Sequence, residues 1–205
     1  MRNAVGFYWT LPVPWAGFKS LPDDIDAAAK VSRTIRYQCE TIRRHARREN
    51  YCLIHEEVYL EINPDRGGDE IRASLTRIAN VCRKQNACLL YVDFSLVQGW
   101  RSHSAMSDWA KNANIALEPL FPDQILMEGQ TFDPTSHFSQ WRERQSNWIQ
   151  KKPERHRIAK RRIADMVAQG TSFKEIAQHL NAANIQSLTG KPWSAEMARK
   201  IQRAP

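Results

Sequence analysis

The sequence predicts an α/β domain with a largely parallel sheet, followed by a long connecting helix and a small all-α domain. Two observations lead to this fold class. Short apolar runs alternate with longer stretches of helical periodicity through roughly the first 120 residues, and this alternation is typical of parallel β-α-β units. The remaining residues contain helical segments interrupted by capping and turn signals, which indicates a separate helical part.

The N-terminal segment predicts a buried strand, a loop and a long helix. Residues 3–10 are apolar and aromatic, as a covered strand requires, and residues 11–22 form an irregular loop containing proline and glycine. A helix is expected from Asp23 to about Glu49, because acidic residues at its start and arginines at its end suit the helix dipole. One apolar stripe at helical spacing supports this helix: Ile35, Cys39, Ile42 and Ala46.

The middle of the chain completes a β-α-β-α-β-α-β order. Residues 52–62 alternate in polarity as a strand does, and residues 87–94 form a nearly continuous apolar run that fits a central strand covered on both faces. A short strand at 114–118 is expected to end at Pro119 and Pro122. The other segments are predicted as a loop at 63–68 and helices at 69–84, 102–113 and 134–150. The last helix carries Phe138, Trp141 and Trp148, and "KKPE" (151–154) breaks it.

Three short helices are predicted after this break. The first spans Glu154–Val167 and ends at a C-cap signal in Gln169-Gly170. Ser172 starts the second helix, and Glu175 three residues later completes a capping box. The third, "AEMARKIQ" (195–202), is expected to be capped by Ser194, with Trp193 before the cap as a hydrophobic staple.

The excess positive charge of the chain lies in this helical region. Residues 151–205 contain 12 Lys and Arg against 4 Asp and Glu, whereas residues 1–150 contain 18 of each. A basic end on a neutral body indicates a surface for a polyanion, most often nucleic acid. Two alternatives remain at this point: a solvated tail that only keeps the protein soluble, and a three-helix bundle that packs on another surface.

A helix-turn-helix that binds double-stranded DNA is the leading interpretation of these helices. The third helix would then lie in the major groove, and cationic and hydroxyl side chains would contact phosphates or base edges. The candidate DNA-binding residues are Arg161, Arg162, Thr189, Lys191, Ser194, Arg199, Lys200 and Arg203.

The stretch "GTSFKEIAQHLNAANIQSLTGKPWS" (170–194) resembles the DNA-binding region of serine recombinases, especially the large ones. In that family the pattern G-x-S-x-x-x-I-A-x-x-L-N-x-x-G-I-x-T-x-x-G-x-x-W recurs. Asn184 stands where the family has glycine, and asparagine also tolerates the left-handed backbone conformation. The matching residues are Gly170, Ser172, Ile176, Ala177, Leu180, Asn181, Ile185, Gly190 and Trp193.

The front of the chain resembles the same family more weakly. "TIRYQCETIRRHA" (34–46) is similar to the family's S-L-E-x-Q-x-x-x-I-x-x-x-A helix. The resemblance implies a resolvase-like three-layer α/β/α domain over residues 1–125, a connecting and dimerisation helix over 126–152, and a helix-turn-helix domain over 153–205. It also implies a homodimer or higher homo-oligomer, and a bacterial, phage or plasmid protein of the cytoplasm that associates with the nucleoid.

The residues expected for catalysis depart from the family pattern. When the first strand is laid on the family's A-x-x-Y-x-R-V-S-T, Trp9 falls at the arginine position and Leu11 at the position of the nucleophilic serine. The later D-R-L-x-R arginines are missing from residues 94–98. Because transesterification of DNA needs a hydroxyl and several cations around the phosphate, we expect no catalytic residues and no strand cleavage.

Two rival functions stay open. The first is an active recombinase in which Ser20 or Ser32 is a displaced nucleophile and in which three arginines supply the cations, namely Arg66, Arg72 and Arg101. The second is a protein-interaction module that does not bind DNA.

Other chemistry finds little support in the sequence. His55 and Glu56 are expected to have a structural role, since the histidines lack metal-ligand spacing. Gly67-Gly68 is not followed by a phosphate-binding motif. The four cysteines have no C-x-x-C spacing and are expected to be reduced thiols. We therefore predict no metal, no cofactor and, without a run of about 18 apolar residues or a signal peptide, no membrane association.

Overall fold

The computed structural model describes residues 1–13, 16–61, 69–98 and 104–203. The chain divides into two compact units. The first comprises Met1–Pro12 and Ser20–Gln140, and the second comprises Val13–Lys19 and Trp141–Pro205. Each unit has its own apolar core, and each is described by itself below.

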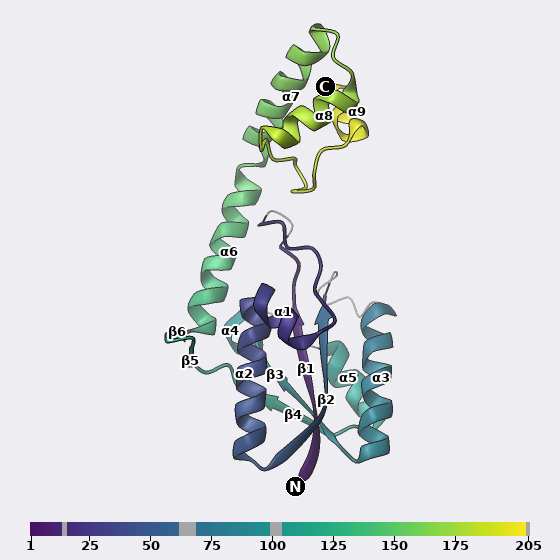
Figure 1. Cartoon of the computed structure of the whole chain (residues 1–205), viewed down its shortest axis with the longest axis vertical. Helices are drawn as coiled ribbons and strands as arrows, with labels where there is room; N and C mark the ends of the chain where they lie inside the picture. The colour runs from purple at the N-terminus through teal and green to yellow at the C-terminus, as the bar shows by residue number, and fades with distance from the viewer. Residues whose placement is uncertain (14–15, 62–68, 99–103, 204–205) are drawn as a thin grey trace. The chain divides into compact units, whose positions relative to one another are not determined.

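A parallel four-stranded sheet forms the centre of the first unit (Figure 1). The strands are β1 (Arg2–Thr10), β2 (Tyr51–Leu60), β3 (Cys88–Val92) and β4 (Leu117–Leu120), and their spatial order is β2-β1-β3-β4. Val5 of β1 lies opposite Leu89 of β3, and Leu89 lies opposite Leu117 of β4. The α/β class and the parallel sheet predicted from the sequence are confirmed.

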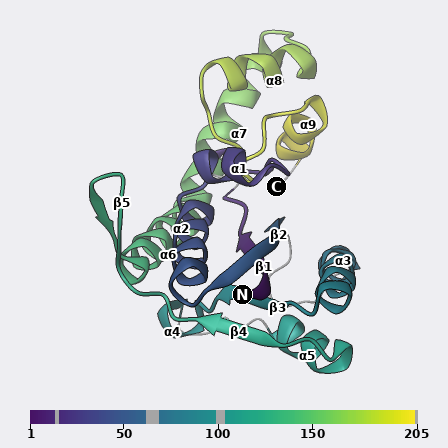
Figure 2. The ribbon, with the colours of Figure 1, turned by 60° about the horizontal axis from the view of Figure 1, so that its bottom comes forward.

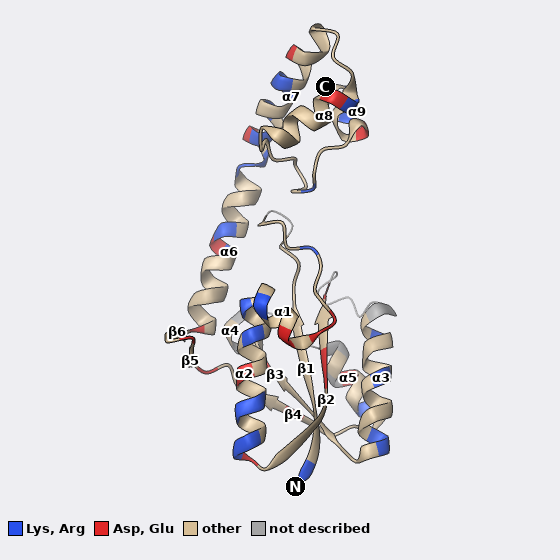
Figure 3. Ribbon diagram, viewed as in Figure 1, with Lys and Arg blue, Asp and Glu red and all other residues tan. Residues whose placement is uncertain are grey.

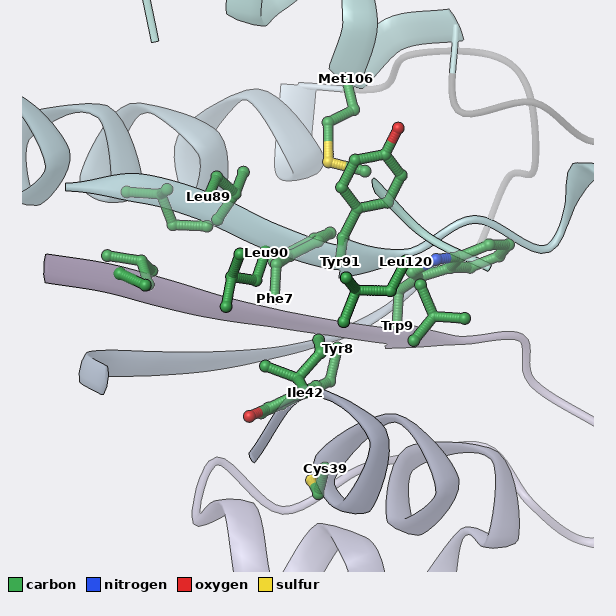
Figure 4. Close-up of a cluster of buried hydrophobic side chains, with 14 of the residues drawn as sticks. Phe7, Tyr8, Trp9, Cys39, Ile42, Leu89, Leu90, Tyr91, Met106 and Leu120 are labelled. Carbon is green, nitrogen blue, oxygen red and sulfur yellow. The ribbon is translucent and has the colours of Figure 1, made fainter. Parts of the chain in front are cut away.

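Helices cover both faces of this sheet, which is compatible with a three-layer α/β/α arrangement. Viewed from below the sheet (Figure 2), α2 (Arg33–Arg48) lies on one side, and α3 (Asp69–Gln85) and α5 (Ser104–Ala113) lie on the other. Tyr8 points from β1 toward Ile42 of α2, whereas Phe7 points toward the opposite face, where Met106 of α5 lies (Figure 4). All four side chains are fully buried. β1 is therefore apolar on both faces because it is a central strand.

The predicted helix from Asp23 to Glu49 is in fact two helices. α1 (Ile25–Val31) ends and α2 begins at Ser32, which has an extended backbone with φ −132° and ψ 113°. The Ser32 hydroxyl accepts a hydrogen bond from the N–H of Ile35 at 3.3 Å. The interruption is possible because Ser32 satisfies an N–H that the first turn of α2 would otherwise leave unpaired.

The end of the sheet also differs from the prediction. Pro119 was expected to terminate the fourth strand, but it lies inside β4, opposite Tyr91 of β3. β4 is the last strand in the order of the sheet, and an edge strand tolerates proline because one side of its backbone needs no partner. The strand begins later than predicted, since Asn114 adopts a left-handed conformation with φ 53°.

Two further elements were not predicted from the sequence. One is the short helix α4 (Ser95–Gln98), and the other is a hairpin of β5 (Ile125–Met127) and β6 (Gln130–Phe132). Glu128 and Gly129 form its turn with φ values of 50° and 75°, as a two-residue hairpin loop with left-handed backbone requires. The buried side chains Ile125, Met127 and Phe132 join the core of the first unit.

Four helices complete the chain. α6 (Pro134–Gln150) matches its predicted bounds, and α7 (Lys152–Ala168) follows after a single intervening residue, Lys151. The interruption at "KKPE" is thus shorter than predicted, because Pro153 lies in the first turn of α7, where a missing N–H costs nothing. α8 (Phe173–Ala182) and α9 (Ala195–Arg203) follow. In the described part of the chain, no helix is long and apolar enough to cross a membrane.

Candidate nucleic-acid interface

The helices α7, α8 and α9 share a small apolar core. Its buried members come from all three helices and from the loop before α9: Ala159, Ile163, Ile176, Ala177, Leu180, Trp193 and Ala198. Gly170, with φ 78°, follows the end of α7. The capping box at α8 is present, because the Ser172 hydroxyl accepts from the Glu175 N–H at 3.4 Å and the Glu175 carboxylate accepts from the Ser172 N–H at 3.0 Å. The local signals in the sequence thus predicted these helix ends correctly.

Side-chain hydrogen bonds hold the loop between α8 and α9. The amide of Asn181 pairs with both backbone groups of Trp193, accepting from its N–H at 2.7 Å and donating to its carbonyl at 3.0 Å. The Trp193 indole N–H donates to the carbonyl of Ile185 at 2.7 Å. The hydroxyl of Ser187, which is 1% exposed, donates to the carbonyl of Lys191 at 2.6 Å. Asn184 adopts the expected left-handed conformation with φ 53°.

These bonds give the motif residues of the sequence a physical role. Asn181, Ile185 and Trp193 were recognised as family-like positions, but their contacts were not predicted. Asn181 and Trp193 are 12 positions apart, so no local pattern in the sequence reveals that they meet. Together they fix the path of the chain into α9, and the Ser194 hydroxyl then caps that helix by accepting from the Met197 N–H at 3.2 Å.

All eight predicted DNA-binding residues are exposed. Arg161 and Arg162 lie on α7, separate in sequence from the other six. The six others occupy the loop and α9: Thr189, Lys191, Ser194, Arg199, Lys200 and Arg203. Figure 3 shows Lys and Arg on both α7 and α9. The structure thus presents cations and hydroxyls on the surface of this unit, as a polyanion-binding face needs.

Contacts restrict two of the α9 cations. The Arg199 guanidinium lies over the ring of Phe173 of α8, 5.3 Å from its centroid. The Lys200 ammonium lies 3.0 Å from a carboxylate oxygen of Glu196, and this hydrogen bond lowers the pKa of Glu196 below its usual value. Glu196 was not among the predicted site residues, although its spacing of four from Lys200 is visible in the sequence.

Arg155 is a further residue that the sequence did not single out. Its guanidinium stacks 3.4 Å from the ring centroid of Trp148 and donates to the Trp148 carbonyl at 2.7 Å. Its Nε and Nη2 atoms are buried without a hydrogen-bond partner among the described residues. Desolvation lowers the pKa of this group. Trp148 lies in the segment 126–152 that the resemblance implies as a dimerisation helix, and in this structure Arg155 stacks on its ring.

The carboxyl end of β1 is the position where the family resemblance predicts a nucleophile. Trp9 is 4% exposed, and Leu11 packs against the core. The buried amide of Gln38 pairs with both backbone groups of Trp9, accepting from its N–H at 3.1 Å and donating to its carbonyl at 2.7 Å. Gln38 stands at the glutamine of the S-L-E-x-Q-like segment, so α2 fixes the backbone of this strand end.

Aromatic rings fill the space between the carboxyl ends of β1 and β3. The chain leaves β1 toward β2 and leaves β3 toward β4, in opposite directions along the sheet, and ligands of open α/β sheets usually bind at such a point. The ring centroids of Trp9 and Phe94 are 5.9 Å apart, and those of Phe94 and Phe138 are 5.0 Å apart. Tyr37 lies 6.0 Å from Phe94 and 4.9 Å from Phe132. This part of the unit is therefore apolar core.

Of the residues proposed for a displaced catalytic site, the structure describes Ser20, Ser32 and Arg72. Ser32 is 7% exposed, and its hydroxyl caps α2. Ser20 is exposed, and Arg72 lies on the exposed side of α3. Arg66, Arg101 and the Gly67-Gly68 pair lie outside the described residues. Of the three arginines, the structure thus describes Arg72 alone.

Charged residues on β2 have structural partners. The Arg43 guanidinium binds both carboxylate oxygens of Glu56 at 2.8 and 3.1 Å, and the Tyr8 hydroxyl also donates to Glu56. His55 lies 3.5 Å from a carboxylate oxygen of Glu57. Across the ranges that the structure describes, no group of three His, Cys, Asp or Glu side chains is arranged to hold a metal ion.

Comparison with known proteins identifies a relationship for the C-terminal helices. A family model described as Recombinase matches residues 154–205, which include almost all of α7 and the whole of α8 and α9. No curated protein and no solved structure matches the chain. The match supports a recombinase-family relationship, and it covers the same helices that carry the exposed cations.

Proposed function

We propose that this chain is a sequence-specific DNA-binding protein derived from a serine recombinase, and that it acts as a regulator or accessory factor without cleaving DNA. One observation carries the proposal: the recombinase match covers all eight predicted contact residues, which are exposed on α7, on α9 and in the loop before α9. In this proposal α8 and α9 form a helix-turn-helix with α9 in the major groove.

Charge supports DNA as the partner. The last 55 residues, 151–205, carry the whole formal charge of +8 of the chain. Lys191 and Lys200 would contact phosphates and release condensed counterions, so that affinity falls as the salt concentration rises. The capped, hydrogen-bonded loop between α8 and α9 would hold these groups in a fixed arrangement, which lowers the entropic cost of binding.

The residues at the carboxyl end of β1 are the reason why we propose that this protein does not cleave DNA. Attack on a phosphodiester needs a nucleophilic oxygen and cations that stabilise the transition state. Leu11 supplies no hydroxyl, Trp9 supplies no charge, and the adjoining space is packed with aromatic rings. In this proposal residues 1–125 are a resolvase-like scaffold, residues 126–152 connect and dimerise two copies, and residues 153–205 bind DNA.

A genome-wide binding profile of the intact protein tests this function. Discrete occupied sites are expected, and a two-fold symmetric sequence at those sites would support a dimer. In solution, the triple variant Lys191→Ala, Arg199→Ala and Lys200→Ala should lose affinity for a duplex from such a site. The slope of log affinity against log salt should fall by up to about 3, since each lost phosphate contact removes about 0.9.

A charge-matched control separates a specific face from net charge. The variant Arg44→Ala, Arg47→Ala and Lys84→Ala removes three exposed cations from the first unit, and it should retain the wild-type affinity and slope. Equal losses in the two triple variants would show that overall charge drives binding. Failure of the intact protein to bind any duplex at physiological salt would favour the protein-interaction module instead.

A further inference from the structure

The exposed face of α9 carries one acidic side chain among three cations. Glu196, Arg199, Lys200 and Arg203 recur at positions i, i+3, i+4 and i+7, and all four are exposed. Ala198, on the other side of the helix, is fully buried in the core. The four charged side chains therefore share one stripe, and α9 cannot present its cations to a partner while turning Glu196 away.

Stability of the helix gives a modest reason for this glutamate, because the helix dipole favours an acidic residue in the first turn. The Glu196 and Lys200 side chains are 71% and 75% exposed, and their ion pair spans one turn of the helix surface. Exposed pairs of this kind contribute little to folding, because solvent screens them and both side chains lose rotamer freedom. Both effects on stability are small, and neither requires the acidic residue to share a stripe with three cations, so we also consider what the stripe contacts.

A carboxylate on a DNA-binding face has two possible neighbours. Beside a phosphate it is repelled, and it then weakens binding to every sequence. Beside a base edge it can accept a hydrogen bond, and among the bases the exocyclic amino group of cytosine is its usual major-groove donor. Glu196 lies in the first turn of α9, and the N-terminal residues of a recognition helix are the ones that reach base edges.

We infer that Glu196 is a specificity-determining residue that accepts a hydrogen bond from the amino group of a cytosine in the major groove. This inference rests on the proposed DNA-binding function. Lys200, 3.0 Å from the same carboxylate, reduces its repulsion from the surrounding phosphates. Arg199 and Arg203 lie on the same stripe beyond it and supply positive charge for the backbone.

Selection from a library of duplexes with random base pairs tests this role, using the full chain as wild type, as Glu196→Gln and as Glu154→Gln. Glu154 is also exposed and also lies in the first turn of its helix, α7, so it controls for loss of one negative charge. Wild type should enrich sites with cytosine at one position of each half-site. Glutamine reads adenine in the major groove, so Glu196→Gln should lose this cytosine and gain adenine there.

The energy of one base contact also sets the expected size of the preference for cytosine. Cytosine should be favoured at that position by roughly 5- to 150-fold in the wild type and in Glu154→Gln, which corresponds to one good base contact. If Glu196→Gln enriches the same sequence as wild type and binds all duplexes more tightly, Glu196 only repels phosphate and the inference is wrong while DNA binding stands. If none of the three proteins enriches any sequence, the proposed function itself fails.

Discussion

Removal of the Asn181 side chain tests how the loop before α9 is held. Asn181→Ala deletes two hydrogen bonds to the Trp193 backbone, at 2.7 and 3.0 Å. Each such bond contributes about 0.5–1.5 kcal/mol net, so opening of the loop should become easier by about 1–3 kcal/mol. This change corresponds to amide exchange that is about 5- to 150-fold faster if exchange requires that opening.

Hydrogen–deuterium exchange measured by mass spectrometry follows this change directly. Peptides that cover residues 185–194 should lose protection in Asn181→Ala, because the Trp193 N–H has lost its acceptor. Gln178→Ala is the matched control, since Gln178 is an exposed amide on the same helix, and it should leave these peptides unchanged. Unchanged exchange in Asn181→Ala would refute the conclusion that this amide fixes the loop.

Three further predictions concern the rest of the structure. Gln38→Leu removes the amide that pairs with the β1 backbone. It should lower the free energy of unfolding of the first unit, measured by urea unfolding, by about 1–3 kcal/mol. An unchanged midpoint of urea unfolding would contradict this prediction. Ser172→Ala should cost about 0.5–2 kcal/mol in the second unit by loss of a helix cap. Hydrogen bonds from Ser172 also lower the pKa of Glu175 below its usual value. The ionised Glu175 therefore stabilises the fold at neutral pH, and this effect is lost as the pH falls through the lowered pKa. A thermal melt that is insensitive to pH between about 5 and 3 would argue against this effect. Burial raises the pKa of the Cys39 and Cys82 thiols to about 12 and about 11. Iodoacetamide at neutral pH should therefore alkylate these two thiols in the denatured protein only. Alkylation of either thiol in the native protein would show that it is not enclosed.

Local signals in the sequence predicted the C-terminal helices well. The capping box of Ser172 and Glu175 and the left-handed Asn184 involve residues that are close in the chain, so their chemistry is visible in a short window. The parallel sheet could also be predicted, because a central strand such as β1 must be apolar on both faces. These features depend on composition and short-range spacing.

Features that depend on distant residues were missed. The pairing of Gln38 with Trp9 joins residues 29 positions apart, and that of Asn181 with Trp193 joins residues 12 apart. The break at Ser32 was hidden because apolar residues continue on both sides of it. The place of Pro119 inside β4 depends on which strand lies at the edge of the sheet, and no local pattern contains that information.

Electrophoresis of a single binding reaction under native and denaturing conditions tests the central proposal most directly. The full chain is mixed with a duplex recovered by its own selection, and both strands are labelled. A shifted complex is expected on the native gel, and two intact strands free of protein are expected on the denaturing gel. A covalent protein–DNA adduct or a cut strand would show that cleavage persists, and the absence of any shifted complex would show that the chain does not bind DNA.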